Sequence, residues 1–271
     1  MTSLERILAI AEAAEQEDGA APLDEATQLA LRRGDARSWV EEGGFALLVG
    51  HDLSVVVHPS ARRQGLGEQL AGQALDEAPA GTLRAWSHCD HPAAVRLAER
   101  HGFERVRELW VMRRPADQPL PDARAREDLT VRGFQPGDEA ELLRVNAAAF
   151  AAHPEQGAMS AEDLAERMAE PWFDPEGLLV ADAGDRLVGF HWTKQHSAEL
   201  GEVYVVGIDP AAQGGGLGKA LTVAGLQHLA ARGVDEVLLY VESDNAAALA
   251  VYSGLGFTHA AEDTHVMYRR G

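Results

Sequence analysis

Apolar residues follow two different spacings along the second half of the chain, and these spacings predict strands alternating with helices. The segments GEVYVVGIDP (201–210) and EVLLYVES (236–243) are dense in β-branched and other apolar residues, which is typical of buried strands. The segments KALTVAGLQHLAARG (219–233) and SDNAAALAVYSGLGF (243–257) have helical spacing and run into glycines. The tail HAAEDTHVMYRR (259–270) alternates apolar and polar positions, so we expect a closing edge strand.

The first half repeats this order of elements. Strands are predicted at LSVVVHP (53–59), LRAWSH (83–88) and ERVRELWVMRR (104–114). Helices are predicted at EQLAGQALDEA (68–78) and HPAAVRLAERHGF (91–103). Each half therefore contains a strand, a glycine-containing turn, a helix, a strand, a helix and a final strand.

Matched residues recur at a nearly constant distance along the chain. An offset of 151 residues relates the strand end and the glycine turn of the two halves, and an offset of 154 relates the Gly-Phe pair after the last helix. The matched positions are Asp209-Pro210 with His58-Pro59, Gly216 and Gly218 with Gly65 and Gly67, and Gly256-Phe257 with Gly102-Phe103. This agreement predicts a tandem duplication of one domain, and two copies are too few for a solenoid. The expected fold class is α/β, with a mixed sheet in each of two tandem domains.

A proline-rich stretch separates the two copies. Pro115, Pro119 and Pro121 stand among mixed charges, a composition that favours an extended chain. We therefore place a linker at 114–128, between an N-terminal domain at 1–113 and a C-terminal domain at 129–271.

Charge and cysteine content limit which binding partners and which cellular compartment we expect. The 271 residues include 43 Asp and Glu against 24 Lys and Arg, a formal net charge of −19, and acids exceed bases in both halves. Such a chain is not expected to bind duplex nucleic acid or an anionic membrane surface. The single cysteine, Cys89, cannot form an intramolecular disulfide, and we expect a buried thiol there. With no signal pattern and no apolar run of spanning length, we expect a monomeric, cytoplasmic protein.

A glycine-rich turn joins the strand at 201–210 to the helix that follows it. Its sequence is Gln213-Gly-Gly-Gly-Leu-Gly218, and Arg62-Arg-Gln-Gly-Leu-Gly67 matches it in the first half. Glycines permit positive φ, and backbone amides at a helix N-terminus favour an anion. The turn is not a P-loop, because Lys219 is followed by Ala220, and it does not fit the dinucleotide fingerprint G-x-G-x-x-G. An anionic ligand is predicted, and a tight turn without a ligand is the alternative.

These motifs resemble those of the acetyl-CoA-dependent N-acetyltransferase (GNAT) superfamily. That superfamily has a Q/R-x-x-G-x-G/A loop after a strand and a later N-x-x-A-x-x-x-Y-x-x-x-G-F helix, and both occur here in order. The resemblance covers most of 129–271 and, less closely, about 45–113. Three further segments are similar to sequences of a tandem-domain branch of the superfamily: AAFAAHPEQG (148–157), HWTK (191–194) and GEVYVVGIDP. This resemblance implies direct transfer of acetyl to the cysteinyl amine of cysteinyl-glucosaminyl-inositol, giving mycothiol.

The resemblance implies which residues hold the co-substrate acetyl-CoA. A strand backbone binds the pantetheine arm, the glycine turn binds the pyrophosphate, and the later helix borders the reactive end. In the second half these residues are Val206, Gly207, Ile208, Gln213, Gly214, Gly215, Gly216, Leu217, Gly218, Lys219, Asn245, Ala246, Ala247, Ala248, Leu249 and Ala250. The first-half counterparts are Val55, Val56, Val57, Arg63, Gln64, Gly65, Leu66 and Gly67.

Two side chains are predicted to catalyse attack of an amine on the thioester. Glu202 lies among apolar strand residues and is the candidate general base. Tyr252 stands at the position of the superfamily's general acid, and the N–H near Val206 is expected to polarise the thioester carbonyl. The alternatives are a solvent-facing charge on an edge strand for Glu202 and a core aromatic ring for Tyr252.

The resemblance also nominates substrate contacts and a difference between the halves. Glu25, Glu155, Lys194, Glu202 and Tyr240 are expected to bind the polyhydroxylated amine. At the offsets of the repeat, Tyr252, Asn245 and Glu202 correspond to Ala98, His91 and His51 in the first half. We therefore expect the first half to keep CoA-binding geometry without efficient turnover. No metal is expected, because the histidine spacings match no metal motif.

Two further functions remain open from the sequence alone. One is a tandem-domain acetyltransferase of another amine, such as a polyamine, an aminoglycoside or a peptide N-terminus. The other is a CoA-sensing protein without turnover. Fold does not decide among these functions, because one fold serves many substrates.

Overall fold

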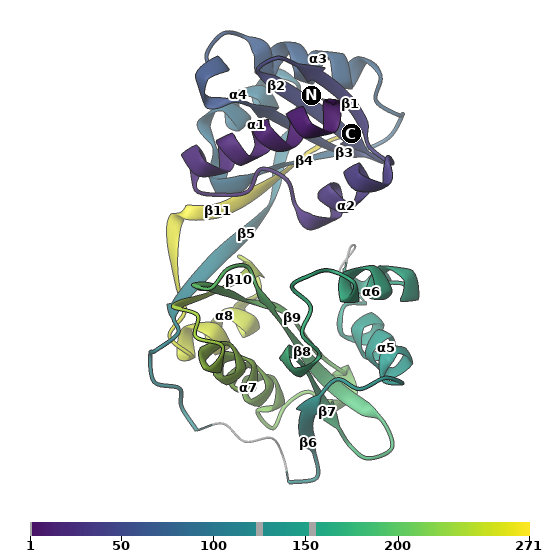
Figure 1. The fold of residues 1–271 in the computed structure, drawn as a ribbon, viewed down its shortest axis with the longest axis vertical. Coiled ribbons are helices and arrows are strands. Elements are labelled where there is room, and N and C mark those ends of the chain that lie inside the picture. The colour runs from purple at the N-terminus through teal and green to yellow at the C-terminus, as the bar shows by residue number, and fades with distance from the viewer. Residues whose placement is uncertain (1, 123–126, 152–155) are drawn as a thin grey trace. The chain divides into compact units, whose positions relative to one another are not determined.

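The computed structural model describes residues 2–122, 127–151 and 156–271 and contains two compact units (Figure 1). The first unit holds residues up to Trp110 together with Ala260–Gly271, and the second holds Val111–His259. Each unit contains sheet strands and a buried apolar core of its own. The expected α/β class with mixed parallel and antiparallel strand pairing is confirmed, and the described strands belong to a single sheet.

Strands of the first unit hydrogen-bond in the order β1-β2-β3-β4-β11. The pair β3–β4 is parallel, whereas β1–β2, β2–β3 and β4–β11 are antiparallel. Helix α1 begins with a capping box at Thr2 and places Ile7, Ile10 and Ala14 on one face, against Phe45 and Leu47 of the sheet. The elements of this unit are α1 (Ser3–Asp18), α2 (Glu25–Arg33), β1 (Arg37–Glu41), β2 (Gly44–Val49), β3 (Asp52–Val57), η1 (Pro59–Ala61), α3 (Leu66–Asp76), β4 (Leu83–Ser87), η2 (His88–Asp90), α4 (Pro92–Arg100) and parts of β5 (Glu104–Pro115) and β11 (Thr258–Arg270).

Strands of the second unit hydrogen-bond in the order β5-β10-β9-β8-β7-β6. The pair β9–β10 is parallel, and the pairs β6–β7, β7–β8 and β8–β9 are antiparallel. The elements are β6 (Thr130–Gly133), α5 (Glu139–Ala149), η3 (Gln156–Ala158), α6 (Ala161–Met168), η4 (Pro175–Gly177), β7 (Leu178–Asp182), β8 (Leu187–Gln195), β9 (Leu200–Ile208), η5 (Pro210–Ala212), α7 (Leu217–Ala231), β10 (Glu236–Glu242) and α8 (Ala246–Gly254).

Helices cover both faces of the β8–β9 pair. On one face, Phe190 and Trp192 are buried in a cluster with residues of α5 and α6. On the other face, α7 lies so close that a Cβ atom at Gly225 would stand 2.1 Å from the His191 ring. Glycine at 225 therefore allows the close approach of α7, which fixes the position of the turn before it.

The structure repeats the predicted correspondence between the two halves. In each unit a strand leads into a one-turn 3-10 helix, η1 or η5, and then into a longer helix, α3 or α7, that starts after a left-handed glycine. His58 Nδ1 accepts from the Ser60 N–H in the first unit, as Asp209 Oδ1 accepts from the Ala211 N–H in the second. The same turn is therefore built twice.

Some features differ from the sequence-based expectation. Periodicity did not identify α1, α2, α5 and α6, which lie outside the repeated segment. The tail predicted as an edge strand of the C-terminal domain is a strand, but its residues from Ala260 onward pack in the first unit, where Val266 pairs with Ser87. The boundaries 1–113 and 129–271 as independently folding domains stay a prediction. Among the described residues, no helix is both long and apolar enough to span a membrane.

Candidate functional site

The glycine turn of the second unit is held at its start by a buried carboxylate. Asp209 accepts hydrogen bonds from the Ala211 N–H at 3.0 Å and from Arg144 Nη1 at 2.7 Å. The Arg144 guanidinium, followed by the Ala211 amide, holds the pKa of Asp209 below its usual value. The turn thus leaves β9 in a fixed direction.

Three consecutive glycines then adopt left-handed backbone conformations. Gly214, Gly215 and Gly216 have φ values of +90°, +58° and +79°, which only glycine adopts at little cost. No side chain caps the N-terminus of α7, and residues 213–216 are exposed. The first-turn amides of a helix lack intrahelical acceptors. Here the Leu217 N–H donates to the Gly214 carbonyl at 3.4 Å, whereas those of Gly218 and Lys219 have no backbone acceptor among the described bonds and are available for an anion. Lys219 lies in the same turn and is half-buried.

A β-bulge interrupts the pairing of β8 with β9. Val205 pairs with Trp192 and Val203 pairs with Thr193, which leaves Tyr204 as an extra residue on β9. Tyr204 and Val205 both pack with the cluster on the α5–α6 side of the sheet. The bulge therefore turns an additional aromatic side chain toward that face and bends the strand.

The parallel pairing of β9 with β10 stops beside the bulge. Its last pair is Val203 with Leu239, although β9 continues to Ile208 and β10 continues to Glu242. In the described pairing, the edge of β9 at Val206, Gly207 and Ile208 has no partner strand on the β10 side. An extended ligand arm could pair with this backbone edge, as an added strand would.

Glu202 lies on the same face as the bulge. Its neighbour Gly201 faces α7, because a Cβ there would stand 2.9 Å from Leu229, so Glu202 points to the opposite side. Its side chain is only 7% exposed and accepts a hydrogen bond from His196 Nε2 at 2.6 Å. Lys194 is its direct cross-strand partner in register. The structure therefore places Glu202 among enclosed groups and not on a solvent-facing edge.

Lys194 lies against aromatic rings on this face. Its ammonium nitrogen is 4.6 Å from the centre of the Trp172 ring and 5.2 Å from that of Tyr204. The Tyr204 hydroxyl accepts a hydrogen bond from Arg167 Nε at 3.1 Å. These contacts hold the lysine by cation–π attraction and fix its position relative to the bulge.

Tyr252 stands on α8, whose N-terminus is capped by Asn245. The Asn245 Oδ1 accepts from the Ala248 N–H at 3.1 Å. Burial raises the pKa of Tyr252 to about 12, so its phenol stays protonated at neutral pH and can donate a proton. Its ring contacts Phe257 edge-on, with centroids 5.9 Å apart, and its hydroxyl has no hydrogen-bond partner among the described residues. The side chain therefore combines a packed ring with an uncommitted hydroxyl.

The rest of α8 offers an uncovered apolar surface. Four of its nine residues are alanine, and none of the nine is fully buried. Ala246, Ala247 and Ala250 are exposed, and Ala248 and Leu249 are half-buried. A ligand that lies beside this helix would bury apolar area, which favours binding.

Of the remaining predicted substrate contacts, Tyr240 lies on the same face of the sheet as Glu202, because it stands two residues after Leu238, the β10 partner of Glu202. Tyr240 is 43% exposed on β10 of the second unit. Glu25 is the first residue of α2 and belongs to the first unit. Glu155 lies outside the described residues. Of this predicted set, Lys194 and Glu202 are brought together directly, as partners in the β8–β9 register.

The first unit has the turn, but its sequence has His51 and Ala98 at the positions of Glu202 and Tyr252. Gly65 has a φ of +83°, and Arg63, at the position of Gly214, has a φ of +62°. The pairing of β2 with β3 runs without a register shift, so this unit has no bulge there. Ala98 stands where the second unit has Tyr252 and lines a cavity of about 80 Å³ with Leu53 and Val55. Helix α4 therefore offers no phenol at the position of Tyr252, and the tyrosine that lines this cavity, Tyr268, comes from β11 and donates to Asp90 at 3.3 Å.

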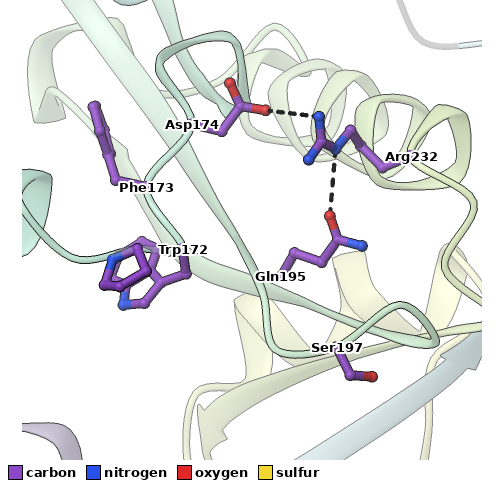
Figure 2. Close-up of a pocket in the computed structure, with 7 residues that line it drawn as sticks. Trp172, Phe173, Asp174, Gln195, Ser197 and Arg232 are labelled. Atoms are coloured by element: carbon purple, nitrogen blue, oxygen red, sulfur yellow. Dashed lines mark hydrogen bonds and ion pairs between the residues drawn. The ribbon is translucent and has the colours of Figure 1, made fainter.

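A cavity of about 450 Å³ in the second unit is lined by Trp172, whose ring contacts Lys194, and by Gln195 and Ser197 on either side of His196 (Figure 2). Arg232 spans it, with Nε donating to Gln195 Oε1 at 3.3 Å and Nη1 lying 3.9 Å from the Asp174 carboxylate (Figure 2). Neither Glu202, Tyr252 nor the glycine turn lines this cavity. The cavity therefore lies beside the Lys194 contacts but does not include the predicted acid, the predicted base or the glycine turn.

Sequence analysis missed His196, which touches Glu202. The residue lies in the hairpin between β8 and β9, where Gln195 pairs with Gly201. A hairpin prediction across 195–201 would have brought His196 close to Glu202, but the hairpin itself was not predicted. The contact between His196 and Glu202 therefore follows from the pairing of β8 with β9 and is not visible as a sequence motif.

A model of the acetyltransferase (GNAT) family matches residues 23–103 and 145–257. The chain is 63% identical to a mycothiol acetyltransferase of Nocardioides sp. over 98% of this chain and 97% of that protein. It is 51% identical to a mycothiol acetyltransferase of Thermomonospora curvata, over 98% of this chain and 93% of that protein.

Solved structures agree with the tandem arrangement. A GCN5-related N-acetyltransferase from Sphaerobacter thermophilus matches with a TM-score of 0.68 and 26% identity, over 100% of this chain and 93% of that chain. A tandem GNAT protein from the clavulanic acid biosynthesis pathway is similar in fold, with a TM-score of 0.69 and 19% identity, over 99% of this chain and 94% of that chain. The resemblance drawn from the motifs is confirmed: the chain is an acetyltransferase of the GNAT family, with relatives named mycothiol acetyltransferase.

Proposed function

We propose that this chain transfers the acetyl group of acetyl-CoA to the cysteinyl amine of cysteinyl-glucosaminyl-inositol and so forms mycothiol. The observation that carries the proposal is near full-length identity of 63% to a relative named for that product. The second unit supplies groups suited to each part of the reaction. The acidic net charge suits this assignment as well, since the acceptor carries a cationic amine.

Acetyl-CoA would lie along β9 with its pyrophosphate at the start of α7. The amides from Gln213 to Lys219 would bind the phosphates, and the unpaired edge at Val206–Ile208 would bind the pantetheine arm. The exposed alanines of α8 would cover the reactive end from the other side. Backbone amides are suitable donors in a chain with only two lysines, because they need no side-chain cation.

Glu202 would remove a proton from the acceptor amine, and Tyr252 would supply a proton to the leaving thiolate. The acceptor amine has a solution pKa near 8 and is largely protonated at neutral pH, so Glu202 would take one proton, directly or through water. The amine nitrogen would then attack the thioester carbonyl, with the carbonyl oxygen facing the N–H near Val206. As the carbon–sulfur bond breaks, Tyr252 would donate a proton to the thiolate and regain one from the new amide nitrogen.

The first unit would contribute binding geometry without turnover. Its turn at Arg63–Gly67 and its strand residues Val55–Val57 would accommodate CoA, while Ala98 cannot replace a phenol. No metal enters this mechanism. The direct transfer uses only an acid, a base and amide donors.

The proposal is tested by incubating the protein with acetyl-CoA and a panel of amines, following thiol release and product mass. We expect cysteinyl-glucosaminyl-inositol to exceed spermidine, an aminoglycoside and a peptide N-terminus in kcat/KM by at least about 100-fold, the discrimination that several unmade hydrogen bonds produce. Equal rates with a simple amine would refute the substrate assignment while leaving the acetyltransferase intact. Glu202→Gln is expected to lower kcat by roughly 10²- to 10⁴-fold, the usual contribution of a general base.

A further inference from the structure

The buried carboxylate of Glu202 has a single connection toward solvent. His196 Nε2 donates to Glu202 Oε2 at 2.6 Å, and no other hydrogen bond of this carboxylate occurs among the described residues. The Glu202 side chain is 7% exposed, whereas the His196 side chain is 35% exposed on the hairpin between β8 and β9. One imidazole therefore touches both the enclosed carboxylate and water.

The proposed reaction must release a proton. A protonated amine and acetyl-CoA give an amide, free CoA thiol and one proton, because the ammonium group loses two protons and the thiolate gains one. The proton taken first by Glu202 must leave before the next turnover. An enclosed carboxylate cannot hand it to bulk water directly, so a route outward is required.

We propose that His196 is a positioning residue for Glu202 that also carries this proton to solvent. The inference rests on the proposed role of Glu202 as the base. While Glu202 is ionised, the ring is the Nε2–H tautomer and donates to the carboxylate. Once Glu202 holds the proton taken from the amine, proton exchange with water converts the ring to the Nδ1–H tautomer, and its free Nε2 accepts the proton from Glu202 to form an imidazolium. Loss of the Nδ1 proton to water then leaves the Nε2–H tautomer beside the ionised carboxylate, so each transfer breaks one O–H or N–H bond and forms another.

Other charged groups near Glu202 are less suited to the task. Lys194 stands opposite Glu202 in the register, but its ammonium lies over the rings of Trp172 and Tyr204 and has no lone pair to accept a proton. Glu199, in the same hairpin as His196, accepts a hydrogen bond from the Ser197 hydroxyl at 2.8 Å. An imidazole is the only neighbouring group that can donate at one nitrogen and accept at the other.

The test compares His196→Ala and His196→Gln with the parent enzyme, using acetyl-CoA and cysteinyl-glucosaminyl-inositol. Glutamine can donate a hydrogen bond to Glu202 but cannot relay a proton. We expect both variants to lose about 10- to 100-fold in kcat, at the lower end of acid–base effects, with KM for acetyl-CoA within about twofold. Added imidazole should restore much of the kcat of His196→Ala in a saturable manner.

His228→Ala provides a matched control. It removes another contact of the same kind, between His228 Nε2 and the Asp174 carboxylate at 3.2 Å, in the same unit. We expect its kcat to stay near that of the parent enzyme and to show no response to imidazole. Any general effect of removing an imidazole–carboxylate pair would appear in both alanine variants.

The outcomes separate this inference from the proposed function. Parent-level kcat in His196→Gln would overturn the relay and leave only a hydrogen-bonding role. Loss of kcat in His196→Ala without imidazole rescue would overturn it as well. Parent-level activity in Glu202→Gln would instead refute the proposed role of Glu202 as the base, on which the role of His196 rests. If Glu202→Gln is impaired, then His196→Ala should add little in that background, because both changes break one route.

Discussion

Removing the Tyr252 hydroxyl should separate catalysis from folding. In Tyr252→Phe the ring keeps its contact with Phe257, and the lost hydroxyl has no hydrogen-bond partner among the described residues. The free energy of unfolding should therefore change by no more than about 0.5 kcal/mol. The thiolate, however, loses its proton donor, and kcat should fall by roughly 10²- to 10⁴-fold, or about 3–5 kcal/mol of activation free energy.

The raised pKa of Tyr252 adds a pH dependence of known sign. Its folded-state pKa of about 12 exceeds the unfolded value near 10, so the folded state holds the phenol proton more tightly. The associated stability is fully present below pH 10 and is lost as the pH rises toward 12. At most about 2–3 kcal/mol is involved. Tyr252→Phe should lack this loss, so the two stability curves should diverge only above pH 10.

Urea denaturation from pH 7 to 12 and steady-state kinetics at pH 7 check both statements. The parent enzyme supplies the reference for the other tyrosines, which titrate in both proteins. Parent-level kcat in Tyr252→Phe would refute the acid role. If Tyr252→Phe lowers both kcat and the free energy of unfolding at pH 7, the claim that the hydroxyl serves catalysis and not folding is refuted.

Three further changes test other parts of the second unit. Gly216→Val should cost about 1–2 kcal/mol in backbone strain, because residue 216 has a φ of +79°. The same change should raise KM for acetyl-CoA, and an unchanged KM would argue against the turn as the phosphate site. Gly225→Ala gains about 1 kcal/mol in helix propensity but forces a Cβ to 2.1 Å from the His191 ring. The clash should win, with a net loss of about 1–3 kcal/mol, measured as a lower urea midpoint. Burial lowers the pKa of His191 to about 4, below its unfolded value near 6.5. The unfolded state therefore binds a proton first as the pH drops from 6.5 to 4, and the free energy of unfolding should fall by up to about 3 kcal/mol over that range. His191→Gln should lack that component in acid titrations of unfolding.

Local backbone requirements made the glycine turn predictable. Gly214 and Gly216 adopt positive φ, and the strand before them is dense in β-branched residues, so both signals lie in a short stretch of sequence. The repeat could be recognised for the same reason, since each half needs the same turn between a strand and a helix. Tyr252 was likewise placed on a helix whose asparagine cap is visible in the sequence.

Pairing partners could not be predicted in the same way. The extra residue Tyr204 and the contact between His196 and Glu202 both depend on the register of β8 with β9. Register is set by turn length and by packing against α5 and α6, neither of which periodicity identified. Likewise, alternation in the tail predicts a strand but does not say which sheet it joins. Residues 266–270 pair with β4 in the first unit, and alternation alone carries no information about that partner.

Holding a phosphate-bearing carrier and activating an amine depend on different features of this fold. Both units have the left-handed glycine before a helix without a side-chain cap. Of the two strands that lead into the described glycine turns, β9 has a bulge, whereas the uninterrupted register of β2 with β3 leaves no residue on β3 equivalent to Tyr204. We therefore expect a duplicated turn alone to preserve anion binding, because its donors are backbone amides that persist when side chains change. We expect the reaction to need the bulge, the enclosed carboxylate and the phenol of α8 together, so the first unit would keep its carrier site without retaining the reaction.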